Sequence, residues 1–354
     1  MPTFLVHLIR RIFSFILILF ITTAVLYATV MFTPAETRAE LYMPPNARQT
    51  EKQRADMIQR IIKTYHLNDP YPVQYYFYIT NILKGSWGFS PTMNEGVFEA
   101  IVVRTPVTAE LTFYSILAFI PLGLLSGVIS GSKQHKFADH SFRFFAYIAT
   151  SLPPFILALI LMAFFYVSLY WFGPERTSTA MGVVLTSPGF HQYTGFVTID
   201  GLLNGRLDVT LDAFRHLVMP VFTLAFAHWA TLGRVTRATM IEESRQEYVV
   251  AARARGLKER TITRRHILRN AIAPALTSSI LSAAALLTGV YVVEIIFNFH
   301  GVSEVAIASM QYTPDAPAAL GFTIYSVIVV LLLMLVLDIL QVIINPRLRE
   351  GQDS

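Results

Sequence analysis

Long apolar runs alternate with polar segments along this chain, and six of the runs are long enough to cross a membrane. A helical span needs about 20 mostly apolar residues, because the hydrocarbon core is about 30 Å thick and each residue rises about 1.5 Å. Backbone groups in lipid must be hydrogen-bonded within the segment, so these runs predict helices. The predicted spans cover residues 12–31, 111–132, 144–172, 216–233, 271–293 and 318–337.

Two of these runs contain residues that are unusual within a span. The third is long and holds Pro153 and Pro154, which predict a kink or a tilted helix because proline lacks a backbone donor. The fourth is short and holds His216, Pro220 and His228. An ionisable residue within a membrane usually faces a cavity or a partner, and for His228 a neutral ring bonded to a neighbouring helix is the simpler alternative.

Basic residues fall mainly in alternate connections between the spans. The segments before residue 12, at 133–143, at 234–269 and after 337 hold 17 of the 28 Lys and Arg residues. Cytoplasmic loops are enriched in these residues, so both termini are predicted to be cytoplasmic. The first run is longer than a typical signal peptide and no A-x-A site follows it, so we expect it to remain as a span.

On this topology the chain divides into four parts. Residues 1–31 form the cytoplasmic N-terminus and first span, 32–105 an external segment, 106–345 a five-helix core, and 346–354 a cytoplasmic tail. The external segment contains an amphipathic stretch at 54–65 and an aromatic cluster at 71–78. These features predict folded structure rather than a linker.

The composition agrees with a membrane protein and excludes other classes. Of the 354 residues, 54% are apolar and 14% are charged, whereas soluble domains average about 45–50% and about 25%. The 26 Phe and 16 Tyr residues exclude a disordered chain. The sequence has no Cys, so disulfides and thiolate metal sites are excluded. The net charge of +5 does not indicate nucleic acid, because the basic residues adjoin spans and have few aromatic neighbours.

No nucleotide-binding or hydrolytic motif occurs in the sequence. It lacks G-x-x-x-x-G-K-[ST], H-E-x-x-H and G-x-S-x-G. The nearest His pair, His135 and His140, lies in a short basic loop, where a solvated loop is a simpler interpretation than a metal site. We therefore predict no catalytic residue, no metal site and no cofactor, and the substrate path stays unassigned.

The largest basic connection, residues 234–270, predicts a helix-turn-helix at the membrane surface. Helix-forming residues dominate before Gly256 and again at about 261–269. Gly256 suits the left-handed conformation that ends a helix. From composition alone, a loop that contacts anionic lipid headgroups and a docking site for another protein are equally good interpretations.

The same connection resembles the cytoplasmic coupling motif of ABC importer permeases. Its run E-Y-V-V-A-A-R-A-R-G-L at 247–257 fits E-Y-[VI]-x-x-A-R-A-x-G-L, and R-x-x-L-R-N-A-x-x-P follows at 265–274. The longer pattern is similar to the dipeptide/oligopeptide (peptide/nickel) importer family. Further matches are L-N-D-P at 67–70, G-S-W-G-F-S at 85–90, T-P-V-T-A-E-L at 105–111, E-I-I-F at 294–297 with Gly301, and N-P-R at 345–347. The resemblance covers nearly the whole chain.

The resemblance implies an all-α polytopic membrane protein with six transmembrane helices, in the type I ABC importer permease fold with a cytoplasmic coupling helix-turn-helix. Such a chain is a transport subunit of the prokaryotic inner membrane, without its own ATP site, and it moves di- or oligopeptides through the lipid bilayer. The implied partners are a second homologous permease, two cytoplasmic ATPase subunits and an external substrate-binding protein.

The resemblance also implies which residues couple transport to ATP hydrolysis. The expected coupling residues are Glu247, Tyr248, Ala251, Ala252, Arg253, Arg255, Gly256 and Leu257. Tyr248, Ala251 and Ala252 share one helical face by their spacing, and small side chains permit close approach of a partner. The general motif begins Glu-Ala-Ala, but its Glu position is Val250 here, so this chain lacks that carboxylate. Gly131 lies outside the motif, and we expect its substitution by Val to be milder than that of Gly256.

Other functions stay open at this point. The same transporter class also carries nickel complexes or oligosaccharides. A proton-coupled secondary transporter requires buried acids and internal repeats, which are not evident in the sequence. A polytopic membrane enzyme requires a polar constellation within the bilayer. The spans offer only His216, His228, Glu110, Glu294 and Asp338, and the three acids are interpreted as interfacial charges.

Overall fold

The computed structural model describes residues 2–40, 42–43, 51–311 and 315–344, and the chain forms two compact units. The first unit takes in Met1–Thr105 and Val302–Leu332. The second unit takes in Pro106–Gly301 and Leu333–Ser354. The described residues are mostly helical, with one two-stranded sheet. The predicted N-P-R match at 345–347 and the predicted tail lie outside the described residues.

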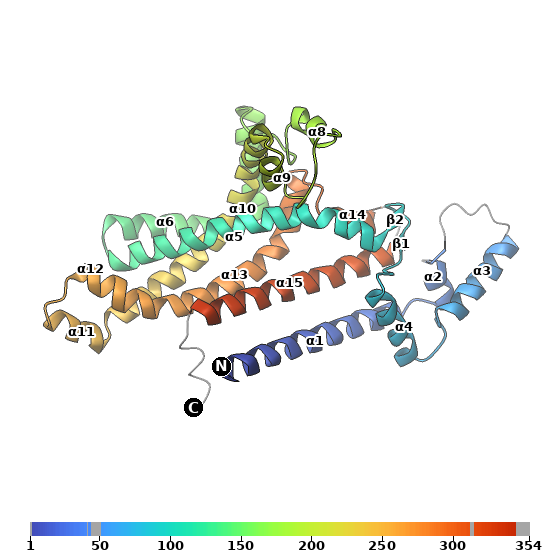
Figure 1. Cartoon of the computed structure of the whole chain (residues 1–354), viewed down its shortest axis with the longest axis horizontal. Helices are drawn as coiled ribbons and strands as arrows, with labels where there is room; N and C mark the ends of the chain where they lie inside the picture. Colours follow the sequence, from blue (N-terminus) through green and yellow to red (C-terminus); the bar gives the residue numbers. More distant parts are fainter. Residues whose placement is uncertain (1, 41, 44–50, 312–314, 345–354) are drawn as a thin grey trace. The chain divides into compact units, whose positions relative to one another are not determined.

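The first unit combines one long helix with several short elements. Its elements are α1 (Pro2–Val30), α2 (Ala35–Glu40), α3 (Glu51–Thr64), α4 (Tyr71–Leu83), β1 (Phe89–Ser90), β2 (Glu95–Gly96), α14 (Ser303–Gln311) and the beginnings of α5 (Val97–Ser132) and α15 (Ala316–Ile344). Helix α1 contacts α4, and α2 contacts α3 (Figure 1). The two strands pair antiparallel. The predicted folding of residues 54–65 and 71–78 is confirmed by α3 and α4.

Buried polar contacts hold the first unit together. The Ser90 hydroxyl donates to the Asp315 carboxylate at 2.5 Å, and the same carboxylate accepts the Ala318 N–H at 3.1 Å. Asp315 therefore joins the strand pair to the first turn of α15, whose unpaired N–H groups attract a carboxylate. Val97 and Val305 lie fully buried beneath this contact region in an apolar cluster.

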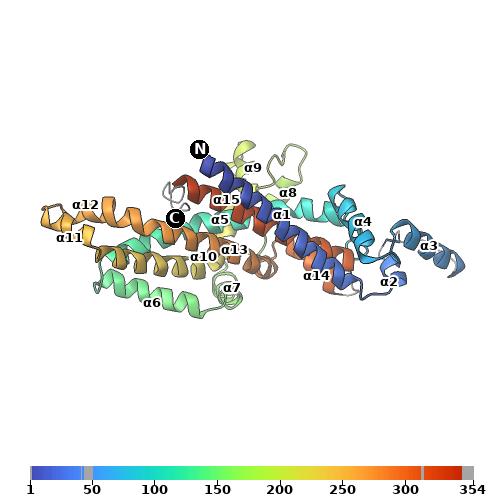
Figure 2. The same ribbon diagram turned by 90° about the horizontal axis from the view of Figure 1, so that it is seen from below.

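The second unit is a packed helical bundle. It contains the rest of α5 and α15, with α6 (Phe137–Ser151), α7 (Pro154–Leu161), the π-helical η1 (Met162–Ser168), α8 (Thr179–Leu185), α9 (Val197–Leu203), α10 (Leu207–Ser244), α11 (Glu247–Ala254), α12 (Glu259–Thr261), the π-helical η2 (Ile262–Ile267) and α13 (Leu268–Ile296). Helix α10 lies at the centre and contacts α6, α7, α9 and α13 (Figures 1 and 2). Its apolar core includes the buried side chains of Leu224, Leu232 and Leu286.

Five described helices are long and apolar enough to cross a membrane. They are Ile9–Val30, Val97–Ser132, Leu207–Ser244, Glu259–Ile296 and Ala316–Leu337. The predicted third span is instead a pair of helices, Phe137–Ser151 and Pro154–Ser168, that meet at an angle of 99°. The kink predicted from Pro153 and Pro154 is confirmed, and the described chain has six spans when this bent pair counts as one.

The predicted limits of several spans were too narrow. Helix α5 has 36 residues and α10 has 38, so each extends for roughly 54–57 Å, well beyond a hydrocarbon core of about 30 Å. The added turns contain charged residues, and the contacts of α10 with α9 and with η2 keep its added turns helical. Hydropathy marks the part of a helix that suits lipid, whereas packing decides where the helix ends.

Three glycines on α5 bring it close to α10. A Cβ at Gly127 would lie 2.5 Å from the Thr236 Cβ, and one at Gly131 would lie 2.7 Å from the Met240 Cβ. Small residues at such spacing let membrane helices approach closely. The expectation that Gly131→Val is milder than Gly256→Val stays a prediction, but this crossing makes Gly131 a poor control, because valine cannot occupy it without moving a neighbouring atom.

Candidate functional site

The basic connection forms a hairpin whose first arm is α11. Helix α10 ends at Ser244, and α11 covers Glu247–Ala254. Gly256 has a φ of +73°, so the predicted left-handed glycine is confirmed. The Gly256 N–H donates to the Arg253 carbonyl at 2.9 Å, and the Leu257 N–H donates to the Ala252 carbonyl at 3.3 Å. These two bonds form a Schellman cap, which satisfies carbonyls that the end of the helix would otherwise leave open.

The second arm of the hairpin is continuous with a long helix. It begins at Glu259 and continues through α12, η2 and α13 to Ile296. The predicted second helix at 261–269 is thus confirmed, but it is the first part of a 38-residue helical run. We call residues 245–269 the basic hairpin. Its short arm, α11, therefore connects the ends of two long helices.

A small apolar core attaches the basic hairpin to those long helices. Met240 of α10, Val249 and Ala252 of α11, Ile262 of η2 and Ala271 of α13 are all buried in one cluster. Val249 and Ile262 are fully buried. Because side chains from α10, α11 and α13 share this core, α11 cannot shift without disturbing both long helices.

The structure separates the predicted coupling residues into supporting and exposed positions. Ala252 is buried, and Tyr248 is half-buried with its hydroxyl donating to the Glu243 carboxylate at 2.5 Å. The exposed residues are Glu247, Ala251, Arg253, Arg255, Gly256 and Leu257. Ala251 therefore does not share the face of Ala252 and Tyr248 as expected. The side chain of Val250, at the position where the general motif has Glu, is 58% exposed.

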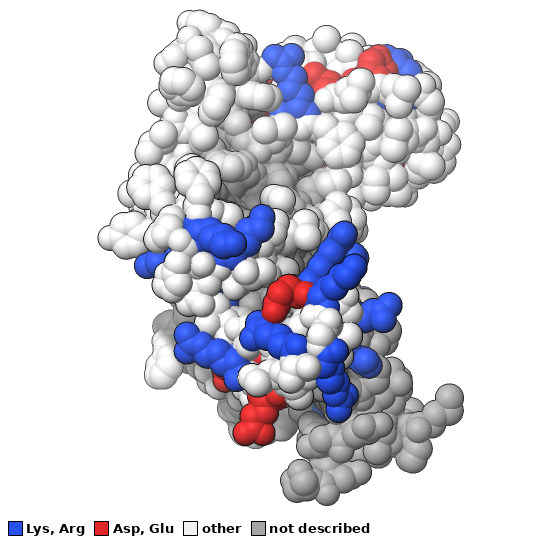
Figure 3. All heavy atoms as spheres, turned by 90° about the vertical axis from the view of Figure 1, so that its left-hand side faces the viewer, with Lys and Arg blue, Asp and Glu red and all other residues white. Residues whose placement is uncertain are grey.

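Positive charge covers the face that carries the basic hairpin. Figure 3 views the side on which α11 and α12 lie in Figure 1, and Lys and Arg side chains gather there among few acids. Arg255, Lys258 and Arg264 are exposed on the hairpin. Arg253 pairs with Glu259 at 2.7 Å, and this carboxylate raises the pKa of the Arg253 guanidinium. The face suits a partner with acidic groups around small apolar contacts.

A buried ion pair, which the sequence did not predict, lies close to the hairpin core. The Arg237 guanidinium of α10 donates to both oxygens of the fully buried Asp139 carboxylate, at 2.5 and 3.0 Å. The Ser130 hydroxyl and the His135 N–H donate to the same carboxylate at 2.6 and 3.0 Å. These contacts join the ends of α5 and α6 to α10, one helical turn before Met240. In the sequence Asp139 is the one acid among several basic residues, and this isolated acid could have indicated an ion pair.

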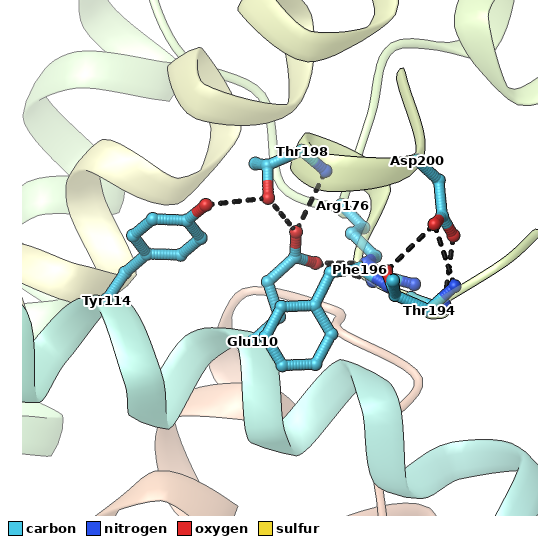
Figure 4. Close-up of polar contacts among 8 residues, drawn as sticks. Glu110, Tyr114, Arg176, Thr194, Phe196, Thr198 and Asp200 are labelled. Carbon is cyan, nitrogen blue, oxygen red and sulfur yellow. Dashed lines mark hydrogen bonds and ion pairs between the residues drawn. The ribbon is translucent and has the colours of Figure 1, made fainter. Parts of the chain in front are cut away.

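A second buried carboxylate corrects the interpretation of the acids at the span edges. Glu110 is 1% exposed and is not an interfacial charge. Its Oε1 accepts the Thr198 N–H at 2.9 Å and the Thr198 hydroxyl at 2.6 Å (Figure 4). Its Oε2 accepts two Arg176 bonds at 2.9 and 2.5 Å. Four donors from two residues of one connection, Arg176 and Thr198, replace the water around an exposed acid, so Glu110 fastens the connection at 173–206 onto α5.

The neighbourhood of Glu110 is ordered by further polar contacts. The Tyr114 and Thr198 hydroxyls lie 2.9 Å apart, and Asp200 accepts the N–H groups of Thr194 and Gly195 at 2.8 and 2.9 Å (Figure 4). Glu294 is also fully buried, which again departs from the interfacial interpretation. A Cβ at Gly301 would overlap its carboxyl group. The side chain of Asp338 lies outside the described residues.

These polar clusters join helices to one another and to their connections. Within the described part of the chain, no group of three or more His, Asp or Glu residues is placed to hold a metal ion. His228 lies beside Phe119, with ring centroids 5.7 Å apart, rather than in a cluster of acids and bases. The surface that distinguishes this protein is therefore the basic hairpin, which can receive another protein.

Long membrane helices joined by such a hairpin define the membrane component of a multi-subunit transporter, and the comparisons with known proteins agree. The family of binding-protein-dependent transport system inner membrane components matches residues 120–350, and its N-terminal model matches residues 4–112. The chain belongs to this family. The resemblance inferred from the basic loop is confirmed.

Several curated relatives are similar over most of their length. The chain is 34% identical to the di/tripeptide transport system permease protein DppB of Pseudomonas aeruginosa, over 80% of this chain and 82% of that one. It is 31% identical to the probable D,D-dipeptide transport system permease protein DdpB of Escherichia coli, over 83% and 85%. It is 30% identical to the oligopeptide transport system permease protein AppB of Bacillus subtilis, over 97% and 98%.

Family membership fixes the general role of the chain. It is a membrane-embedded permease subunit of a binding-protein-dependent transporter, of the type I importer fold. The subunit is not itself an enzyme, since ATP hydrolysis belongs to separate subunits of these transporters. ATPase and substrate-binding components are its partners in general terms.

Proposed function

We propose that this chain forms part of the translocation path for di- or oligopeptides in an ATP-driven importer. The observation that carries the proposal is similarity over nearly the full chain to permeases named for di/tripeptides, D,D-dipeptides and oligopeptides. The alternative is an ATP-driven importer of the same class that carries nickel complexes or oligosaccharides. The uptake experiment below tests it.

The assembly that we propose contains four further proteins. A second homologous permease completes the path, two cytoplasmic ATPase subunits drive it, and an external binding protein delivers the substrate. Both termini of this chain are cytoplasmic in the proposed orientation, because the basic hairpin then faces the ATPase subunits. The excess of Lys and Arg around that hairpin supports this orientation.

We assign the ATPase contact to the exposed side of α11. Ala251 and Gly256 offer small surfaces for close approach, with Glu247, Arg255 and Leu257 around them. Arg253 contributes charge through its exposed pair with Glu259. Ala252 and Tyr248 support the helix from beneath, so they set its position rather than meet the partner.

Motion of α11 has a direct route into the membrane helices. The apolar core at Met240, Val249 and Ala271 connects it to α10 and α13, and the Asp139–Arg237 pair extends that connection to α6. A displacement imposed by ATPase subunits would therefore move several packed helices as one body. Rocking of such bodies is a general route to alternating access.

The coupling role is tested by Gly256→Val, with Gly205→Val as a matched control. Both glycines end a helix in the left-handed conformation, with φ of +73° and +67°, and a Cβ at either would meet nothing within 4 Å. Both also have the same pair of capping bonds. A Cβ in this conformation costs about 1 kcal/mol, and a branched one more, which re-aims a short helix but does not unfold the bundle.

In reconstituted vesicles we expect Gly256→Val to insert and assemble normally, yet to lose substrate-stimulated ATP hydrolysis and uptake. Gly205→Val should have the same thermal stability as Gly256→Val and retain both activities. If the two variants were equally active, the coupling role would be contradicted and the basic hairpin would be a lipid-facing loop.

The substrate is tested by uptake into vesicles that contain the complete transporter and its binding protein. ATP-dependent accumulation of labelled dipeptides is the expected result. Accumulation of nickel complexes or oligosaccharides in place of peptides would change the cargo and leave the transporter class intact. Uptake by this chain without ATPase subunits would contradict the class itself.

A further inference from the structure

The first unit contains a cavity lined by aromatic rings and one buried cation. Its volume is about 40 Å³, and its lining includes Tyr27, Arg38, Tyr42, Tyr65, Tyr78 and Trp87. A buried water requires at least about 10–15 Å³, so the cavity has room for a few waters or for one small polar group. None of the described residues that line it is acidic.

Arg38 is buried, and none of the described carboxylates neutralises it. It is 6% exposed, and its guanidinium donates to the Gln74 side-chain oxygen at 2.6 Å and to the Leu67 carbonyl at 2.7 Å. Both acceptors are uncharged, and no ion pair in the described part of the chain involves Arg38. Burial of a cation without a counter-charge is costly, because its hydration is lost and nothing charged replaces it.

Two donors beside the cavity have no partner. The Arg38 Nε and the Tyr78 hydroxyl are buried and form no hydrogen bond, and both residues line the cavity. Burial raises the pKa of the Tyr78 hydroxyl, and it raises the pKa of the Tyr42 hydroxyl to about 12. Both hydroxyls therefore remain protonated and can donate hydrogen bonds. Buried donors in native proteins are nearly always satisfied, so two beside one cavity indicate an acceptor that occupies it.

The donors and the buried charge of the cavity favour a small anion with two acceptor oxygens, and stacked tyrosine rings form its walls. Tyr27 and Tyr78 stack with centroids 4.5 Å apart, and Tyr42 and Tyr65 stack at 4.2 Å. A carboxylate is planar, carries one negative charge and offers two acceptor oxygens, which suits a guanidinium and a separate hydroxyl. Water would satisfy the donors but leave the charge unbalanced, and the volume is too small for a bulky organic anion.

We propose that this cavity binds the carboxylate of a small anion, held by Arg38 and Tyr78. The carboxylate has two possible sources, a free ion such as acetate or the C-terminal end of a peptide. Only the peptide source rests on the proposed transport function. The site would neutralise Arg38 and join α2 to α4 when it is occupied.

The test is thermal unfolding of the purified full chain in detergent, with acetate or formate replacing chloride at constant ionic strength. A ligand that binds only the folded state raises the midpoint in proportion to the logarithm of its concentration above Kd. We expect this rise for acetate and formate in the wild-type chain and its loss in Arg38→Gln. The charge-matched control Arg60→Gln, at an exposed position of α3, should behave as the wild type.

Tyr78→Phe keeps the proposal testable if Arg38→Gln fails to fold. It removes a hydroxyl that has no partner, so its midpoint without acetate should equal or exceed that of the wild type. Its response to acetate should fall several-fold, whereas Tyr76→Phe, at an exposed position of the same helix, should respond fully. A wild-type midpoint that is the same in acetate as in chloride, or a response to acetate that is equally large in Tyr78→Phe, would overturn the proposal.

A second arm identifies the source of the carboxylate. A dipeptide is compared with the same dipeptide amidated at its C-terminus. Stabilisation by the acid but not by the amide assigns the site to peptide ends, and stabilisation by acetate alone assigns it to a free ion. Either result upholds the carboxylate site. If only the dipeptide fails to stabilise the chain, the transport proposal is unaffected, because the uptake experiment tests it separately.

Discussion

Two Arg–Glu pairs in the second unit differ in whether their charges are satisfied by other groups of the chain or are exposed to solvent. At Glu110 the acid is 1% exposed, and both of its oxygens are filled by Arg176 and Thr198. On the basic hairpin Arg253 is 45% exposed and Glu259 is 66% exposed, and their pair stands in solvent. In the first region every charged group has partners within the chain. In the second region charged and small side chains are exposed on the surface. A closed polar cluster indicates a structural joint, and an open one indicates a surface for a partner.

The energetic consequence is that stability and function should depend on different regions. Breaking a buried pair leaves an uncompensated charge and costs about 3–5 kcal/mol. An exposed pair contributes about 1 kcal/mol or less, because water screens it and long side chains lose freedom when they pair. Substitutions at Glu110 should therefore destabilise the protein strongly, while substitutions on the hairpin should leave stability nearly unchanged and alter coupling.

The largest effect is expected for Glu110→Ala. It removes the acceptor of Arg176 and of both Thr198 donors, so we expect a loss of about 3–5 kcal/mol in unfolding free energy. Thermal unfolding of the purified protein measures this loss. Glu242→Ala, at an exposed position of α10, is the control and should change little. Similar midpoints for the two variants would mean that the cluster in Figure 4 does not fasten the connection.

A smaller loss of stability is expected for Gly131→Val. The new side chain would meet the Met240 Cβ and the Arg237 carbonyl, at 2.7 and 3.1 Å from its Cβ. Overpacking of this kind costs about 1–3 kcal/mol. Because Met240 belongs to the hairpin core, we also expect reduced stimulation of ATP hydrolysis. Gly189→Val, where a Cβ meets nothing within 4 Å, should be neutral in both assays; an equally neutral Gly131→Val would show that α5 and α10 separate easily.

Local signals made the basic hairpin predictable. Gly256 marked the end of α11 because a left-handed residue is needed there, and Pro153 with Pro154 marked the bend between α6 and α7. The assignment of the coupling residues stays a prediction, although the structure now separates exposed Ala251 from buried Ala252. Each of these signals depends on residues that are close in the sequence.

The buried pairs could not be predicted in the same way. Asp139 and Arg237 are 98 residues apart, and Glu110 lies 66 residues from Arg176. Their partnership depends on tertiary packing, and a single sequence shows only that a charge lies near a span. Helix ends were missed for a related reason, since contacts between α9 and α10 extend helix structure beyond the apolar run.

The smallest effect on stability is expected for Glu259→Gln, which removes one of the two exposed acids of the basic hairpin, the one paired with Arg253. The fold should lose no more than about 0.5 kcal/mol, because the Arg253–Glu259 pair is exposed and screened. The same substitution leaves Arg253 without its carboxylate and makes the hairpin face more positive. Charges at the rim of an interface act mainly on association rate and on salt dependence.

We therefore expect Glu259→Gln to steepen the salt dependence of assembly with the ATPase subunits, while the unfolding midpoint and the maximal rate of stimulated hydrolysis stay unchanged. Assembly is measured from low to high ionic strength, with Glu242→Gln as the control on α10. The double variant Arg253→Gln/Glu259→Gln should return the salt dependence towards that of the wild type, because the net charge of the pair is restored to zero. A salt dependence that is identical in all variants would place the ATPase contact away from this end of α11, and a large loss of stability would show that the exposed pair is as structural as the pair at Glu110.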